Sequence, residues 1–278
     1  MHSDPWRQLN VAFPDWSCAE LTAVAHLGPL LTAAEDDGRL DAWFFIRKAP
    51  YWRIRYSAAD PTAATTFLRQ QLEMFATTRA IEGIAEVVYE PETHVFGGGA
   101  ATVTAHRLFH SDSRHLLAQL ADPPSPAGGH RRELAFLVCT ALLRAAGLDW
   151  YEQGDVWARV AEHRKLPDPV PGCTHPGQAE VEMFLAADPD HLSHHGGPLA
   201  FAAAWIAAHS TAGRHLATLA AAGTLHRGLR AVVAHHVLFT WNRHGLPYAT
   251  QGVLARTATS AVFGPDPASQ PPRERTRP

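Results

Sequence analysis

Residues 40–57 of the 278-residue chain read LDAWFFIRKAPYWRIRYS, and this stretch decides the expected fold. It contains two runs rich in aromatic and β-branched side chains, Leu40–Lys48 and Trp52–Ser57, with the short link Ala49–Tyr51 between them. Runs of this kind, separated by a few residues that include proline, are typical of neighbouring strands. The stretch therefore predicts a β-hairpin.

Further strands and helices are expected on both sides of the hairpin: strands over Trp6–Phe13 and Ile84–Tyr89, and a helix over Thr62–Arg79. Another helix is expected to begin at a cap on Asp15 or Ser17 and to run to about Glu35. Pro29 lies inside this helix and lacks an N–H group, so a kink or a break is expected near Leu27.

From Gly97 onward the sequence is helical, with expected helices over Ala100–Leu120, Arg131–Ala146, Val156–Arg164, His175–Ala186, Leu199–Ala221, Leu225–Arg243 and Tyr248–Val262. Loops rich in proline, glycine or histidine are expected at Asp122–Gly129, Leu166–Gly172 and Asp188–Pro198. The fold class is therefore expected to be α+β. A small, mostly antiparallel sheet with helices covers about residues 1–96, and a helical half covers about 97–263. The polar, proline-rich stretch 264–278 is expected to be a disordered tail.

The composition, 46% hydrophobic and 18% charged residues, fits a soluble globular protein with a sizeable core. A formal net charge of −3 argues against a nucleic-acid partner, because nucleic-acid-binding domains are usually strongly basic. The cysteines Cys18, Cys139 and Cys173 are scattered without CxxC spacing, which fits a reducing compartment. No apolar run reaches the roughly 18 residues that a membrane span needs. No signal peptide is recognisable either, so a cytoplasmic location without a membrane partner is expected.

Arg53 and Arg55 form the first candidate site. Side chains alternate along a strand, so these two arginines point to the same face about 7 Å apart, and Arg47 on the preceding strand could join them. Three guanidinium groups on one sheet face suit carboxylates or peptide carbonyls. The alternative is a solvated sheet face.

The second candidate site is the turn Tyr89-Glu90-Pro91-Glu92-Thr93-His94, which is followed by Phe96 and three glycines. Pro91 ends the strand, and the glycines open a helix. Carboxylates and an imidazole on such a turn are suited to acid–base chemistry when they are partly buried. The alternative is a tight turn with solvated acids.

Two histidine-containing helices complete the candidates. On the expected helix after Gly97, His106 and His110 share a face, but the spacing lacks the intervening glutamate of a zincin, and no metal site is expected. The penultimate helix carries a polar stripe that indicates a lined cavity or a buried hydrogen-bond network, formed by His235, His236, Asn242 and Arg243. The alternative there is a core histidine with a helix-end arginine. No glycine-rich phosphate loop is present, so no cofactor is expected.

Six motifs in order resemble the SpaB C-terminal family, which comprises the glutamate-elimination domains of lantibiotic dehydratases and the stand-alone thiopeptide-type enzymes: Trp43–Arg47, Arg53–Arg55, Tyr89–Glu92, Gly97–Gly98, Ser111–Ser113 and Asn242–Arg243. The resemblance covers about residues 6 to 263. It implies a single lantibiotic-dehydratase C-terminal-like domain over 1–263.

The resemblance implies three roles in the biosynthesis of a ribosomally made, post-translationally modified peptide (RiPP). A pyridine synthase joins two dehydroalanines in a formal 4+2 cycloaddition, closes a macrocycle and releases the leader peptide. A split elimination enzyme removes glutamate from glutamylated serine or threonine. A scaffold binds the precursor without catalysis. Elimination domains typically carry an arginine where this chain has Val95 and a histidine where it has Leu238. These departures favour the pyridine synthase.

Under this resemblance, Arg47, Arg53 and Arg55 are expected to grip the substrate, and Asn242 and Arg243 to brace the site. Proton transfer is assigned to Tyr89, Glu92 and His94, with His235 and His236 facing them across a cleft. The expected partner is a precursor peptide with a leader and a dehydrated core, the leader adding a strand to a sheet edge. The chain carries no large glutamylation domain, so a separate dehydratase is implied. A homodimer is possible.

Overall fold

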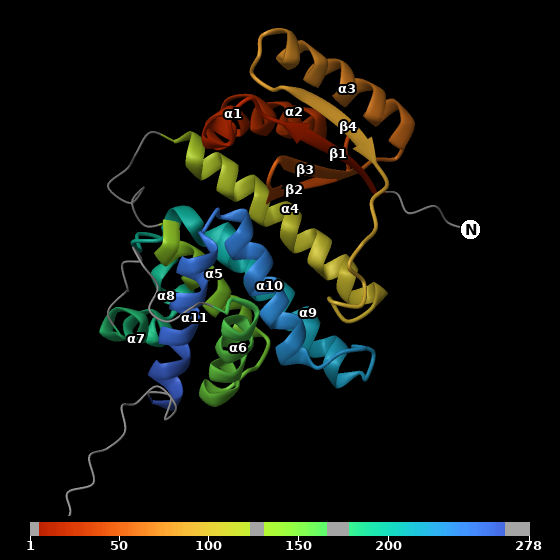
Figure 1. Cartoon of the computed structure of the whole chain (residues 1–278). Helices are drawn as coiled ribbons and strands as arrows, with labels where there is room; N and C mark the ends of the chain where they lie inside the picture. Colours follow the sequence, from red (N-terminus) through yellow and green to blue (C-terminus); the bar gives the residue numbers. More distant parts are fainter. Residues whose placement is uncertain (1–5, 123–130, 166–177, 265–278) are drawn as a thin grey trace, which may run out of the picture.

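The N-terminal part of the chain folds around one antiparallel sheet with the strand order β2-β3-β1-β4 (Figure 1). The strands are β1 (Trp6–Ala12), β2 (Ala42–Lys48), β3 (Tyr51–Ser57) and β4 (Gly83–Val87). The structure is a computed structural model that describes residues 6–122, 131–165 and 178–264. It confirms the hairpin, which β2 and β3 form, and the α+β class.

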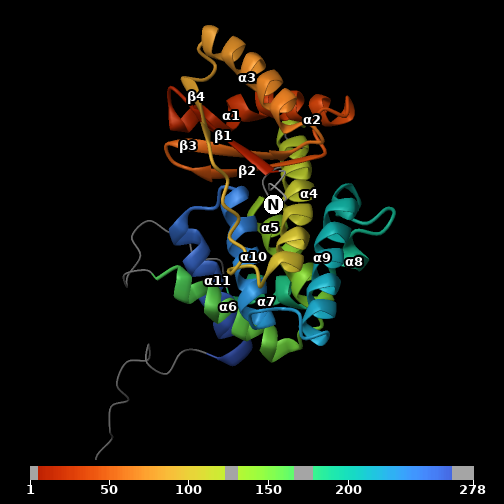
Figure 2. The ribbon, with the colours of Figure 1, turned by 90° about the vertical axis from the view of Figure 1, so that its right-hand side faces the viewer.

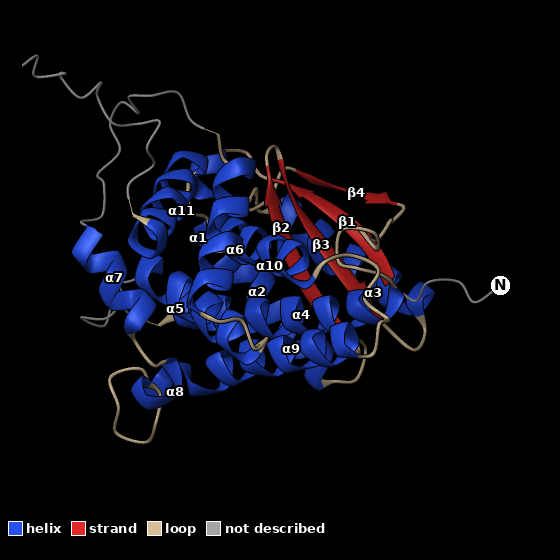
Figure 3. Ribbon diagram, turned by 90° about the horizontal axis from the view of Figure 1, so that it is seen from below, coloured by secondary structure: helices blue, strands red, loops and turns tan. Residues whose placement is uncertain are grey.

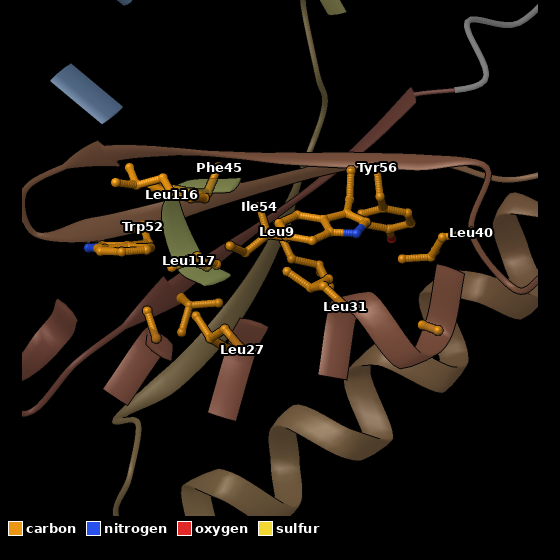
Figure 4. Packing of buried hydrophobic residues seen from close by; sticks show 14 of the residues in the cluster. Leu9, Leu27, Leu31, Leu40, Phe45, Trp52, Ile54, Tyr56, Leu116 and Leu117 are labelled. Atoms are coloured by element: carbon orange, nitrogen blue, oxygen red, sulfur yellow. The ribbon is translucent and has the colours of Figure 1, made fainter. Parts of the chain in front are cut away.

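The sheet presents two different faces. Trp52, Ile54 and Tyr56 of β3 lie on the face that packs against the N-terminal helices, where Leu27 and Leu31 meet them (Figure 4). Arg53 and Arg55 lie on the opposite face, toward the helical half. The side chains of β3 alternate between the two faces, so hydrophobic residues lie on one face and the arginines on the other.

Three helices cover the apolar face: α1 (Ala19–Thr22), α2 (Gly28–Asp36) and α3 (Pro61–Thr77). Between α1 and α2 the chain makes a π-helical turn, Ala23–Leu27. The expected irregularity near Leu27 is thus present, as a change of hydrogen-bonding pattern rather than a break. Pro29 sits in the first turn of α2, where a missing N–H group costs little.

The long helix α4 (Gly99–Ala121) links the sheet to the helical half (Figure 2). Its side chains also cover the outer edge of β2. The Ser113 hydroxyl accepts a hydrogen bond from the backbone N–H of Phe45 at 3.3 Å, and His110 contacts the backbone of Trp43. This cover prevents β2 from pairing with a further strand.

The remaining helices form the second layer: α5 (Arg131–Ala145), α6 (Trp150–His163), α7 (Gln178–Ala186), α8 (Pro189–Leu192), α9 (Ala203–Ala221), α10 (Leu229–Arg243) and α11 (Tyr248–Phe263) (Figure 3). They enclose a second hydrophobic core that includes Trp157 and Trp241. None of the helices that the structure describes is long and apolar enough to span a membrane.

Several expected boundaries are wrong. The helix predicted from Leu225 begins only at Leu229, because the preceding loop is held elsewhere: the backbone N–H of His226 donates to the carbonyl of Gly97 at 2.8 Å. The helix predicted from Val156 begins six residues earlier, where Asp149 and Glu152 form a capping box. The loops predicted at Asp122–Gly129 and Leu166–Gly172, the start of the helix predicted from His175, and the tail lie largely outside the described residues.

Candidate functional site

One cleft of about 320 Å³ gathers side chains from three distant parts of the chain. The β2–β3 hairpin supplies most of them, the turn after β4 supplies a carboxylate, and the C-terminal end of α10 closes the cleft. Its lining consists of Ile46, Arg47, Lys48, Arg53, Arg55, Glu92, Phe239, Asn242 and Arg243. The structure thus brings together six of the ten predicted site residues. A larger cavity of about 630 Å³, lined partly by Leu134 and Phe184, contains none of them.

Arg55 is held rigidly at the base of the cleft, where its side chain is 3% exposed. Its Nε donates to Gln8 Oε1 at 2.8 Å, and its guanidinium carbon lies 4.5 Å from the centre of the Tyr89 ring. The Tyr89 hydroxyl in turn hydrogen-bonds His106 Nε2 at 2.7 Å. Tyr89 therefore supports Arg55 from below and does not line the cleft itself.

Glu92 is the one carboxylate among the lining residues that the structure describes. Its two oxygens lie 3.5 Å from the Nη atoms of Arg55, which is a long contact for an ion pair. The side chain remains 35% exposed. A loosely held, accessible carboxylate can accept a proton from a bound ligand.

Arg243 rests on a buried polar network. Its Nε donates to Asp112 Oδ2 at 2.6 Å, and both side chains are fully buried. Trp205 Nε1 donates to Asp112 Oδ1 at 2.7 Å, and His209 and His244 lie within 4 Å. Burial alone would raise the pKa of Asp112, but Arg243 and the neighbouring histidines outweigh it and hold that pKa well below its usual range. Asp112 therefore stays ionised and fixes Arg243 at the cleft.

Arg47 does not share the sheet face of Arg53 and Arg55, so the expected cluster of three guanidinium groups on one face is wrong for this residue. It is paired with Trp52 across the hairpin and projects to the face of the N-terminal helices, where its guanidinium carbon lies 4.6 Å from the centre of the indole ring. It pairs with Glu20, which Arg131 Nη2 also binds at 2.7 Å. Gly245, at φ +73°, lies against the guanidinium: a Cβ atom there would come within 3.0 Å of Arg47 Nη1. Glycine at this position thus leaves the room that the arginine occupies.

Several guanidinium nitrogens around the cleft have no hydrogen-bond partner within the part of the chain that the structure describes. Among the described residues, no partner reaches Arg47 Nε and Nη2, Arg53 Nε, or Arg243 Nη1 and Nη2, although these atoms are buried. Buried donors without partners are costly and rare in proteins. These nitrogens are inaccessible to water, so they bind the acceptor oxygens of a ligand only when the guanidinium groups turn toward it.

The predicted histidines lie outside the lining. His94 is exposed on the turn that follows β4. His235 lies on the same face of α10 as Phe239 but one turn earlier, where it meets His163 of α6. His236 points into the core between Phe96 and Phe109 and is fully buried. The expected facing of His235 and His236 toward Glu92 across the cleft is therefore not seen, because α10 turns other residues to the cleft.

Sequence reasoning missed the residues that hold the site together. Asp112 lies inside the Ser111–Ser113 motif, yet sequence reasoning assigned it no role. A carboxylate in the middle of a helix, together with an arginine at the end of another apolar one, is the signal for such a pair. Lys48 follows Arg47 directly and also lines the cleft. No group of three or more potential ligand side chains within the described part of the chain is arranged to hold a metal ion.

The buried histidines predict that acid destabilises the protein. Burial, the largest cause, lowers the pKa of His209 to about 4 and of His236 to about 3, from 6.5. Asp112 opposes the shift at His209, while Arg243 adds to both shifts. Below pH 6.5 the unfolded chain binds protons that the folded chain does not, so stability falls as pH falls.

We expect a loss of about 2 kcal/mol for each of these two histidines between pH 7 and pH 5. Urea denaturation at pH 7, 6 and 5 measures it. A His236→Gln variant should show a shallower dependence. A free energy of unfolding that stays constant over this range would contradict the expectation.

Comparisons with known proteins agree with the fold. A family model described as lantibiotic biosynthesis dehydratase C-term matches residues 6–262. No curated protein matches the chain. A crystal structure of the tRNA-dependent lantibiotic dehydratase MibB from Microbispora sp. 107891 is similar, with 20% identity and a TM-score of 0.66. The match covers 95% of this chain but only 28% of MibB. The crystal structure of TsrL is similar with 16% identity and a TM-score of 0.55, over 94% of this chain and 99% of TsrL.

Proposed function

The chain belongs to the lantibiotic dehydratase C-terminal family, and we propose that it joins two dehydroalanines of a RiPP precursor peptide in a formal 4+2 cycloaddition. Membership places the chain in the tailoring of ribosomally made peptides. The reaction itself is our proposal, and the donor-rich cleft with Glu92 is the observation that carries it.

The proposed reaction depends mainly on positioning. Two dehydroalanines must lie about 3–3.5 Å apart in a reactive orientation, and holding them so supplies a large part of the rate enhancement. Peptide carbonyl oxygens are acceptors that match the unpaired nitrogens of Arg47, Arg53 and Arg243. Because these side chains are buried or braced, they bind the peptide without a large loss of side-chain entropy.

Proton transfer is the second requirement, since one amide must tautomerise to an iminol that serves as part of the diene. A donor near its carbonyl and a base near its N–H promote this step. In our proposal the guanidinium of Arg53 or Arg243 hydrogen-bonds the carbonyl oxygen without losing a proton, and Glu92 takes the proton from the amide N–H and returns it to that oxygen, which gives the iminol. Tyr89 acts indirectly, by supporting Arg55. Proton transfer by His94, His235 and His236 remains a prediction from the sequence.

A second function, glutamate elimination, is favoured by the charge of the cleft. Four arginines and Lys48 face Glu92, so the lining carries a positive excess that suits a departing glutamate. Elimination also needs a base for the Cα proton, and because no histidine is among the described lining residues, Glu92 is the candidate for that role as well.

The leader peptide is proposed to bind at β4. One outer edge of the sheet, that of β2, is already covered by α4. The other outer strand is β4, and no strand of the described residues pairs with its free edge. Such an edge accepts an extended peptide as an additional strand. A separate dehydratase is proposed to supply the dehydrated core, and a homodimer remains part of the proposal.

Mass spectrometry with two leader-bearing peptides tests the proposal. One peptide carries two dehydroalanines, and the other carries a glutamylated serine. A macrocycle formed with release of the leader from the first peptide supports the cycloaddition. Loss of glutamate from the second peptide supports elimination. If both peptides bind and neither changes, both catalytic proposals fail and the scaffold role is supported.

Arg53→Ala is expected to weaken binding of the dehydrated peptide about tenfold or more, because a charge-assisted hydrogen bond is worth about 1.5–3 kcal/mol. Fluorescence anisotropy with a labelled peptide measures the dissociation constant. Arg214→Ala is the control, since Arg214 is exposed on α9 and belongs neither to the lining of the cleft nor to β4. Equal binding by both variants would remove the cleft from the peptide site.

A further inference from the structure

Asn242 stands in the wall between two clefts. It lines the cleft of about 320 Å³ and a neighbouring one of about 240 Å³ that Trp16 and Trp52 also line. A side chain in this place contacts a peptide that occupies either cleft. Which end of its amide faces the peptide decides whether it donates or accepts a hydrogen bond.

The orientation of the Asn242 amide follows from Arg164, whose guanidinium donates hydrogen bonds but cannot accept them. Arg164 Nε lies 2.8 Å from the side chain of Gln251, which is 2% exposed. A guanidinium only donates, so the Gln251 atom at this contact must be its oxygen. The amide nitrogen of Gln251 then points the other way, and it donates to the carbonyl of Leu246 at 2.7 Å and to Asn242 at 3.0 Å.

The Asn242 atom that receives this bond must therefore be Oδ1. Arg164 Nη2 donates to the same oxygen at 3.2 Å, so Oδ1 has two donors. Its Nδ2 has no hydrogen-bond partner within the described part of the chain. The two N–H groups of Asn242 are thereby left for the clefts.

We propose that Arg164 and Gln251 are positioning residues that hold the Asn242 amide with its N–H groups turned toward an acceptor oxygen of the bound peptide. Neither residue is in the lining of the two clefts. The inference rests on the proposed function, since it takes the cleft to be the peptide site. Its ligand is a backbone carbonyl or a carboxylate of the peptide, because only an acceptor satisfies Nδ2.

Gln251→Glu is expected to reverse the orientation of the Asn242 amide, because glutamate has the same shape as glutamine but lacks its N–H donors. A glutamate still accepts from Arg164, but it presents an oxygen to Asn242. The Asn242 amide then turns over, which gives up the 3.2 Å bond from Arg164 Nη2, and its Oδ1 faces the cleft. We expect the dissociation constant of the peptide with two dehydroalanines to rise about tenfold. The thermal midpoint should fall by only a few degrees: the bond to the carbonyl of Leu246 is lost, and the ion pair of the new carboxylate with Arg164 offsets part of that loss.

Two comparisons separate positioning from a general structural role. Asn242→Ala should weaken binding about tenfold in the wild-type background but have almost no further effect beside Gln251→Glu, because the same donor is already lost. Arg164→Lys keeps a donor-only partner for Gln251 and should bind within about threefold of wild type. Arg164→Met should weaken binding about as much as Gln251→Glu.

Peptide binding by Arg53→Ala distinguishes a failure of the positioning inference from a failure of the proposed function. Loss of binding by Arg53→Ala with wild-type binding by Gln251→Glu would overturn the inference and leave the proposed function standing. Additive effects of Asn242→Ala and Gln251→Glu would also overturn it. Wild-type binding by Arg53→Ala would instead refute the proposed peptide site.

Discussion

Replacing Asp112 by asparagine is expected to lower the free energy of unfolding by about 3–5 kcal/mol, the range typical of breaking a buried ion pair. The change leaves the guanidinium of Arg243 buried without its counter-charge, as both side chains are fully buried. It also removes the charge that partly offsets the burial of His209 and His244. The expected loss is a large part of the stability of an ordinary domain.

Urea denaturation at pH 7 measures this loss, with Asp36→Asn as the matched control. Asp36 is 65% exposed, and its contact with Arg114 is long, at 3.9 Å. Replacing it should therefore change the free energy of unfolding by less than about 0.5 kcal/mol. Adding Arg243→Met to Asp112→Asn should restore much of the loss, because no unpaired charge is then buried. A fall of less than about 1 kcal/mol for Asp112→Asn would show that the pair does not hold the core.

Glu92→Gln is expected to reduce turnover about 10²- to 10⁴-fold, the usual contribution of a general base, while the shape of the cleft is kept. Binding of the dehydrated peptide should weaken little, because Glu92 is the single carboxylate opposite five cationic side chains in the described lining. The effect therefore falls on the rate constant rather than on the dissociation constant.

Single-turnover mass spectrometry measures the rate, and anisotropy measures the binding. Glu90→Gln is the control: Glu90 is an exposed carboxylate on the same turn that does not line the cleft. It should react like wild type. Equal rates for the two variants would exclude Glu92 as the base and would direct attention to the histidines predicted from the sequence.

The sheet side of the site could be predicted because its geometry is local. Alternation along one strand suffices to place Arg53 and Arg55 together. The same alternation puts Arg47 on the opposite face, in register with Trp52, and Arg47 lines the cleft from the end of its strand. The proline in the turn after β4 was enough to place Glu92 at the end of a strand. These features depend on residues close together in the sequence.

The helical side could not be predicted in the same way. The polar stripe on α10 indicates which residues are candidates for the site. Which of them face the cleft depends on the rotation of the helix about its axis, and packing against distant elements sets that rotation. Phe96 and Phe109 surround His236, so it became part of the core. The partner of Arg243 is Asp112, far away in sequence, and no local pattern connects them. The hydrogen bond from Gln251 to Asn242 likewise could be recognised only in the folded structure.

The cleft draws one wall from the hairpin near the beginning of the chain and the opposite wall from the last turn of α10 near its end. During synthesis the sheet can form early, and Arg47 and Arg55 can already pair with Glu20 and Glu92, but the opposite wall of the cleft is absent until residues 242 and 243 have left the ribosome. Contacts so distant along the chain close slowly. Completion of the site is therefore a late event of co-translational folding, and nascent chains shorter than this point carry half a binding site.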